Sequence, residues 1–181
     1  GANTEMPFTE KERVATPLTF YAATKLANEA MGHSFANIYN LPITMFRFFT
    51  VYGPWGRPDM AYFKFARNII DGKPIDIYNN GDMWRDFTYV DDLVRGIAGL
   101  IDKVPLRPEK PEDIAPGDSL SPAAPFRVVN IGNSAKIRLL DFIDAIEAEI
   151  GKKAIRNYMP MQQGDVLATW ADASLLLPLT G

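Results

Sequence analysis

The chain of 181 residues contains no cysteine and only one histidine. Without cysteine it can form neither a disulfide framework nor a thiolate zinc site, and a single imidazole argues against a catalytic metal. No apolar run approaches the roughly 18 residues of a membrane-spanning helix, and no signal-peptide pattern opens the chain. We therefore expect a soluble, cytoplasmic protein without a metal centre.

Basic clusters are also lacking. The formal net charge is −3, and lysine and arginine never form a run longer than two residues. This pattern argues against general nucleic-acid binding, but it leaves open the binding of an anionic small molecule through a few placed arginines. The apolar content of 47% over this length is sufficient for one sizeable core.

Apolar periodicity alternates between helical and extended segments along the chain. The expected helices cover residues 17–40, 60–71, 91–103, 138–150 and 172–177. The expected strands cover residues 43–49, 75–78, 84–90, 126–131 and 155–159, and the first is apolar enough to be buried on both faces. Residues 104–125 carry six prolines without any period and are expected to form a long surface loop. The alternation predicts an α/β domain with a largely parallel sheet.

Tyr21 and Lys25 lie four residues apart in the first expected helix, and therefore on one helix face. A free phenol is a poor base at neutral pH, but an ammonium one turn away, together with a nearby nicotinamide cation, stabilises the phenolate. The pair alone favours the alternative of two side chains that meet on a solvated helix face. Its place before an apolar strand and a Gly/Pro-rich loop favours the base of a hydride-transfer enzyme.

A second motif decides between these two interpretations. After the Tyr-x3-Lys helix, the sequence of residues 47–54 (Arg-Phe-Phe-Thr-Val-Tyr-Gly-Pro) resembles the extended short-chain dehydrogenase/reductases, specifically their nucleotide-sugar epimerases and dehydratases. The longer string 47–61 is similar to the UDP-glucuronate 4-epimerase branch. The motifs at 85–92, 130–133 and 163–166 match the same family in order and spacing. The resemblance covers essentially the whole chain and implies the C-terminal part of a Rossmann-like fold with a small substrate-binding domain.

The resemblance also implies NAD as the cofactor, although no glycine-rich dinucleotide motif follows any expected strand. We therefore expect the main NAD-binding half to lie upstream of Gly1, and the chain to be a piece of a longer protein. Within it, residues 1–58 would end the Rossmann-like domain and carry the Tyr-x3-Lys helix. Residues 59–125 would hold a substrate-binding segment, a Rossmann-side helix and the proline-rich loop. Residues 126–181 would return a strand to the sheet and then add substrate-domain elements.

Thr50 and Arg57 are candidates for binding the sugar. Thr50 follows a buried strand, which is where open α/β sheets present groups to ligands. Relatives that act on neutral sugars commonly have asparagine here, so the threonine favours an acidic sugar. Arg57 could bind a carboxylate with two hydrogen bonds. The alternatives are a strand-end hydroxyl and a solvated loop cation.

The resemblance assigns the nucleotide to further residues. Arg85 matches an arginine that binds the UDP diphosphate, with a surface pair to the neighbouring Asp86 as the alternative. Asp165 matches a carboxylate that receives ribose hydroxyls. Gln162 stands where some relatives carry a phosphate-binding arginine, which puts that contact in doubt.

Four further positions concern the uracil and the coenzyme. Ile77 and Tyr78 would border the uracil, and ordinary strand core is an equal alternative for both. Phe48 and Phe49 match positions near the nicotinamide. Neighbouring residues of a strand point in opposite directions, so at most one of these two can contact the coenzyme. Tyr21 and Lys25 would contact it as well.

The sequence thus predicts a full-length NAD-dependent 4-epimerase of a UDP-sugar, most like the enzymes that convert UDP-glucuronate to UDP-galacturonate, and a homodimer. By the resemblance, Tyr21 takes the proton of the sugar 4-hydroxyl and a 4-keto sugar forms. A UDP-glucuronate decarboxylase or another nucleotide-sugar epimerase/dehydratase is the alternative with the same fold. An inactive UDP-sugar-binding piece is the alternative that is not an enzyme.

Overall fold

The computed structural model describes residue 3 and residues 5–12, 14–162 and 164–181. Gln163, in the last motif of the resemblance, lies outside these residues. The described helices are α1 (Phe20–Tyr39), α2 (Ala61–Asp71), α3 (Val90–Leu100), α4 (Leu139–Ile150) and α5 (Leu176–Thr180), with short 3-10 turns η1 (Tyr78–Gly81) and η2 (Pro111–Asp113). The strands are β1 (Ile43–Phe48), β2 (Thr50–Tyr52), β3 (Pro74–Ile77), β4 (Trp84–Arg85), β5 (Phe87–Tyr89), β6 (Phe126–Ile131), β7 (Ile137–Arg138), β8 (Ile155–Tyr158) and β9 (Ala168–Thr169). The expected α/β class is confirmed.

Helix α1 begins after Thr19, three residues later than the sequence predicts. The Thr19 side chain accepts a hydrogen bond of 3.1 Å from the amide of Ala22, which satisfies one of the free donors of the first turn. The helix ends at Asn40, whose left-handed backbone closes it. The cap places Tyr21 and Lys25 in the first two turns.

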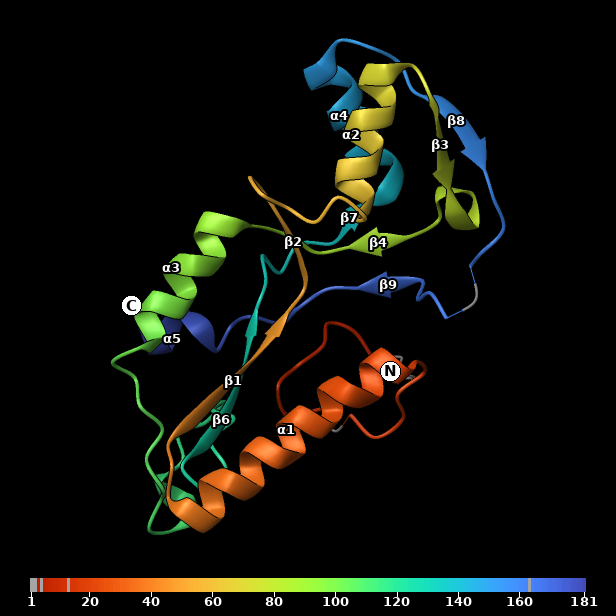
Figure 1. Cartoon of the computed structure of the whole chain (residues 1–181). Coiled ribbons are helices and arrows are strands. Elements are labelled where there is room, and N and C mark those ends of the chain that lie inside the picture. The colour runs from red at the N-terminus through yellow and green to blue at the C-terminus, as the bar shows by residue number, and fades with distance from the viewer. Residues whose placement is uncertain (1–2, 4, 13, 163) are drawn as a thin grey trace.

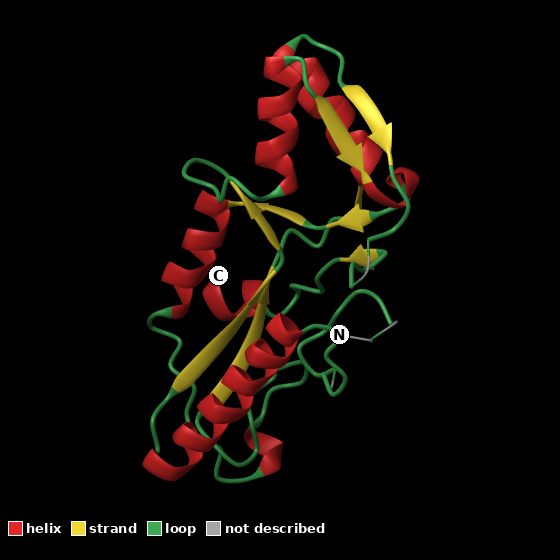
Figure 2. Ribbon diagram, turned by 45° about the vertical axis from the view of Figure 1, so that its right-hand side comes forward, coloured by secondary structure: helices red, strands yellow, loops and turns green. Residues whose placement is uncertain are grey.

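Strands β1 and β6 pair in parallel, with Ile43 opposite Phe126 and Phe48 opposite Ile131. Helix α1 lies along one face of this pair, and α3 and α5 lie on the other (Figures 1 and 2). Strand β6 is buried along its whole length, whereas β1 is only half-buried. The sequence prediction that β1 is buried on both faces is therefore wrong. Among the described strands β1 pairs with β6 alone, so its other edge stays open.

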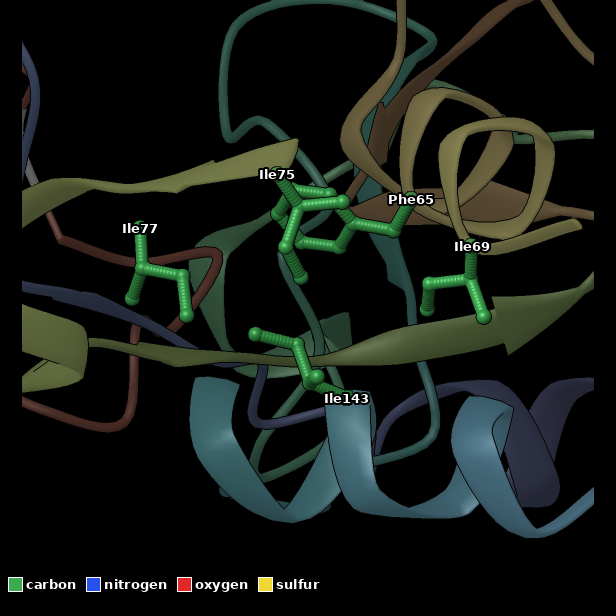
Figure 3. Close-up of a cluster of buried hydrophobic side chains, with 5 residues drawn as sticks. All are labelled: Phe65, Ile69, Ile75, Ile77 and Ile143. Atoms are coloured by element: carbon green, nitrogen blue, oxygen red, sulfur yellow. The ribbon is translucent and has the colours of Figure 1, made fainter. Parts of the chain in front are cut away.

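A second group of elements packs α2 and α4 against the parallel pair β3–β8, at the upper end of Figure 1. Its core consists of Phe65, Ile69, Ile75, Ile77 and Ile143, whose side chains converge between α2, β3 and α4 (Figure 3). Helix α2 stops at Gly72, which adopts φ of 68°, as the sequence predicts.

Short strands connect the two groups. Strand β2 pairs in parallel with β5, and β4 lies between β7 and β9. The expected strand 84–90 is broken at Asp86, and β1 ends one residue early, at Phe48. At the break the amide of Thr50 donates to the carbonyl of Asp86 at 3.0 Å, so the chain changes pairing partner there.

The predicted bounds of two further helices are also wrong. Helix α3 begins at Val90 and ends at Leu100, and α5 covers Leu176–Thr180 instead of residues 172–177. Asp172 lies instead in a local turn, where its carboxylate accepts from the amide of Ser174, and its carbonyl accepts from the side chain of Asn130.

The proline-rich loop is tied to the sheet by one buried ion pair. The Arg127 guanidinium on β6 donates two hydrogen bonds of 2.9 Å to the carboxylate of Asp118, and both side chains are about nine-tenths buried.

No helix in the described part of the chain has both the length and the apolar character of a membrane span. The predicted division at residues 58 and 125 stays a prediction.

Candidate active site

Tyr21 and Lys25 lie together on α1. The Lys25 ammonium is 5.1 Å from the centre of the Tyr21 ring, and the phenol is 68% exposed. Both side chains line a groove of about 540 Å³ between α1 and β1, and Phe48 lines it as well. The groove thus offers an accessible hydroxyl, a cation beside it and an apolar surface.

Phe48 and Phe49 point in different directions. Phe48 is half-exposed in the groove and its ring stacks with Phe46 at 5.8 Å. Phe49 lies close to Gly132, where a Cβ would be 3.3 Å from its ring. Of the two, only Phe48 lines the groove with Tyr21 and Lys25.

A separate cavity of about 170 Å³ brings together four of the predicted substrate residues: Thr50, Tyr78, Arg85 and Asp165. Apolar side chains from α2 and α4 line its walls, and the rings of Phe87 and Phe142 stack there at 4.2 Å. The cavity therefore combines an apolar lining with a few polar groups, which is typical of small-molecule sites.

Arg85 is the cation of this cavity. Its Nη2 donates to Oδ1 of Asp165 at 2.8 Å, and its Nη1 donates to the carbonyl of Trp84 at 2.8 Å. Burial lowers the pKa of the Arg85 guanidinium, and the Asp165 charge opposes this change. The alternative pair with Asp86 does not form, because the Asp86 carboxylate is bonded elsewhere.

Three predicted residues lie outside the cavity lining. Ile77 is fully buried in the core beside α2 and α4. Arg57 is exposed and donates to Asp59 at 2.5 and 3.1 Å; this hydrogen bond raises the pKa of Arg57 and lowers that of Asp59. Gln162 is exposed, and its carbonyl accepts from the amide of Asp165 at 3.1 Å.

Sequence reasoning missed the role of Asp86. This fully buried carboxylate accepts hydrogen bonds from the amides of Asn133, Ser134 and Ala171 at 2.9–3.1 Å. It thereby holds two loops next to the strand that carries Arg85. Gly132 completes the arrangement, since a Cβ there would be 2.9 Å from the carboxylate. An acidic residue in the middle of an otherwise extended aromatic segment was the available signal.

Sequence reasoning also assigned no role to the tryptophans. The Lys136 ammonium lies 4.7 Å from the ring of Trp84 and 4.8 Å from that of Trp170. This cation–π contact joins the chain before β7 to β4 and to the residue after β9. It braces the small sheet that supports Arg85.

The linings of the groove and the cavity include residues on either side of the end of β1. Phe48 lines the groove and Thr50 lines the cavity, so two residues of extended chain, roughly 6–7 Å, separate them. The two candidate sites thus share the end of β1. Carboxyl ends of parallel strands are the usual place for such sites.

Comparison with known proteins gives consistent results. A model of the NAD dependent epimerase/dehydratase family matches residues 1–114. Protein CapI of Staphylococcus aureus is 52% identical over 172 residues, which are 95% of this chain and 51% of that protein. A probable UDP-glucuronate 4-epimerase of Rhizobium meliloti (strain 1021) is 53% identical over 184 residues, covering 100% of this chain and 53% of the relative.

Among solved structures, UDP-glucuronic acid 4-epimerase from Bacillus cereus, in complex with UDP-glucuronic acid and NAD, is similar with a TM-score of 0.80 and 31% identity. The match covers 98% of this chain and 51% of that one. The chain thus spans about half the length of the relatives it matches.

Proposed function

Since the chain belongs to the NAD dependent epimerase/dehydratase family, we propose that the whole protein is an NAD-dependent 4-epimerase of UDP-sugars that interconverts UDP-glucuronate and UDP-galacturonate. The similarity to proteins named UDP-glucuronate 4-epimerases supports the substrate. No contact among the described residues favours the decarboxylase or the dehydratase alternative.

The main support for the proposal is the set of residues around Arg85. Arg85 lines an apolar-walled cavity together with Thr50, Tyr78 and Asp165. A forked cation suits a diphosphate, and hydroxyl and carboxylate groups suit the hydroxyls of ribose and sugar. We assign the UDP part of the substrate to this cavity.

The neighbouring groove supplies the acid–base chemistry. The accessible Tyr21 hydroxyl would take the proton from the sugar 4-hydroxyl and later return it, while the Lys25 ammonium stabilises the phenolate form. Tyr21, Lys25 and Phe48 fit a nicotinamide coenzyme, since the groove joins hydrogen-bonding groups to an exposed aromatic surface. NAD, when bound, supplies the acceptor and donor of hydride.

An enzyme that acts on a uronic acid must also prevent decarboxylation of the keto intermediate. A 4-keto sugar with a 5-carboxylate is a β-keto acid, which loses carbon dioxide when the scissile bond aligns with the carbonyl π-system. The carboxylate must therefore be held out of this alignment. We assign this task to Thr50, which lines the cavity just after the end of β1, and to Arg57.

Calorimetric titration with UDP tests the diphosphate assignment. We expect Arg85→Ala to weaken UDP binding by about 2 kcal/mol, because a charge-assisted hydrogen bond to a partly buried anion is lost. Arg95→Ala is the matched control, because Arg95 is an exposed arginine of α3 that lies outside the cavity lining. Equal UDP affinities in wild type and Arg85→Ala would overturn the assignment.

We also propose that the protein forms a homodimer through the outer face of α1. The helix contains only two charged residues, Lys25 and Glu29, and both face the groove. Its outer face exposes Phe20, Met31, Phe35 and Ile38. Pairing of two copies about a twofold axis would bury this uncharged stripe against itself.

Light scattering after size-exclusion chromatography tests the dimer. Phe35→Glu should give monomers, whereas Val94→Glu, at an equally exposed apolar position on α3, should leave dimers intact. A Phe35→Glu dimer would contradict the proposed interface.

Three expectations stay predictions from the sequence: the cytoplasmic location, the absence of nucleic-acid binding and the three-part division of the chain.

A further inference from the structure

The guanidinium assigned to the diphosphate already has a negatively charged partner in this structure. Arg85 Nη2 donates to Asp165 Oδ1 at 2.8 Å, and the side chains are only 20% and 31% exposed. The same Asp165 oxygen accepts from the amide of Val166 at 2.9 Å, so the carboxylate is held in this orientation. An anion that enters the cavity must therefore compete with a carboxylate that is in place beforehand.

The other charges of the cavity increase this barrier. Its described lining contains one cation, Arg85, and two carboxylates, Asp76 and Asp165. Asp76 is not bonded to Arg85; its carboxylate accepts from the side chain of Asn157 at 2.7 Å. The formal charge of the lining is thus −1, and an anion meets net repulsion until Asp165 is displaced or finds other partners.

We propose that Asp165 is a specificity-determining residue: it neutralises Arg85 in the free protein and so excludes simple phosphates in favour of ligands that carry hydroxyl groups beside a diphosphate. The inference rests on the proposed binding of a diphosphate at Arg85. A bare phosphate exchanges one ion pair for another and leaves the partly buried Asp165 without its partner, which is unfavourable. A nucleoside diphosphate also brings hydroxyls, and these donate hydrogen bonds to the released carboxylate.

The test compares inorganic pyrophosphate with UDP by calorimetry on the full chain. For wild type we expect UDP to bind and pyrophosphate to bind much more weakly. In Asp165→Asn, pyrophosphate should bind at least about tenfold more tightly than in wild type, because the competing charge-assisted hydrogen bond is removed. UDP should bind to Asp165→Asn no more tightly than to wild type. The ratio of UDP affinity to pyrophosphate affinity should therefore fall by at least the factor that pyrophosphate gains.

Asp76→Asn is the matched control, because it removes the same charge from the same cavity without releasing Arg85. A ratio that falls as far in Asp76→Asn as in Asp165→Asn would overturn the proposal in favour of general electrostatics. Asp165→Ser provides a second variant of the same charge change, and thermal melts of all variants check folding.

Two failures can be told apart. If Arg85→Ala weakens UDP binding but Asp165→Asn and Asp165→Ser do not bind pyrophosphate more tightly, Asp165 only orients Arg85 and this inference is wrong. If Arg85→Ala leaves UDP binding unchanged, the proposed diphosphate site is wrong and the role of Asp165 falls with it.

Discussion

The guanidinium of Arg47 on β1 forms two hydrogen bonds of 2.8 Å with the carboxylate of Glu29 on α1. Both side chains are about four-fifths buried. This two-point ion pair explains why an arginine interrupts an apolar strand. It fixes the helix that carries Tyr21 and Lys25 to the strand that ends at Phe48, and so sets the width of the groove.

Glu29→Gln should therefore destabilise the protein. We expect a loss of about 1–3 kcal/mol in the free energy of unfolding, because the Arg47 side chain, about four-fifths buried, would remain without its charged partner. The control is Asp92→Asn, which removes the exposed pair with Arg95 and should change stability by less than about 0.5 kcal/mol. Urea unfolding measures both, and equal losses would contradict a special role for the Glu29–Arg47 pair.

The second prediction concerns Tyr21, in a protein that joins this chain to the coenzyme-binding half. Tyr21→Phe should reduce turnover by at least about 10²-fold, since a positioned acid–base group is lost, while UDP-sugar affinity stays nearly unchanged. Tyr39→Phe removes an equally exposed phenol from the other end of the same helix and should leave turnover unaffected. An active Tyr21→Phe enzyme would contradict the acid–base role and leave Tyr21 as a solvated residue on the helix face.

The elements with strong local signals were predictable from the sequence. Strand β6 has the predicted bounds, and α2 and α4 end at glycines with positive φ, as their sequences indicate. Strands β7 and β9 were missed because each has only two residues and depends on pairing with β4. These strands form because of tertiary contacts, and local propensity does not predict such contacts.

In the candidate site, too, features with a local sequence signal were predictable, and features that depend on tertiary contacts were not. The spacing of Tyr21 and Lys25 on one helix places both in the groove, and a strand position places Thr50 in the cavity. The pairs Arg85–Asp165 and Arg57–Asp59 were not foreseen. The first joins residues 80 positions apart, and the second depends on a loop conformation. Binding roles for all these residues stay predictions.

A third prediction uses the pH dependence of stability. Glu147 on α4 is 3% exposed and accepts hydrogen bonds from Lys153, Arg156 and the amide of Ala154. The side-chain hydrogen bonds from Lys153 and Arg156 lower its pKa from 4.5 to about 2. Because the folded-state pKa is the lower one, the stabilisation is complete above about pH 4.5 and is lost as pH falls toward 2.

Glu147→Gln should accordingly lower the free energy of unfolding at pH 7 by about 2 kcal/mol, the scale of a hydrogen bond to a charged group. The difference from wild type should shrink between pH 4.5 and pH 2. Glu149→Gln, at an exposed position of the same helix, is the control and should show little effect at any pH. Denaturant unfolding at several pH values measures this, and a pH-independent difference would argue against the ionised Glu147.

The last prediction concerns Arg57, whose guanidinium is bound to Asp59 in this structure. A uronic-acid carboxylate must displace Asp59 to reach it, and the pair is exposed, which makes the exchange easy. In the protein joined to its coenzyme-binding half, Arg57→Ala should lower the affinity for UDP-glucuronate and leave that for UDP-glucose unchanged, because only the former carries a carboxylate. Asp59→Asn frees Arg57 and should shift the ratio of the two affinities in the opposite direction.

The same Arg57→Ala variant should release more decarboxylated product. Once Arg57 no longer holds the 5-carboxylate, the ring can change its pucker so that the bond from C5 to the carboxylate aligns with the π-system of the 4-keto group, and carbon dioxide is lost. Mass spectrometry of the products gives the ratio of epimer to UDP-pentose in wild type and variant. If Arg57→Ala keeps both the affinity ratio and the product ratio of wild type, Arg57 is a solvated loop cation, and Thr50 alone is left to hold the carboxylate.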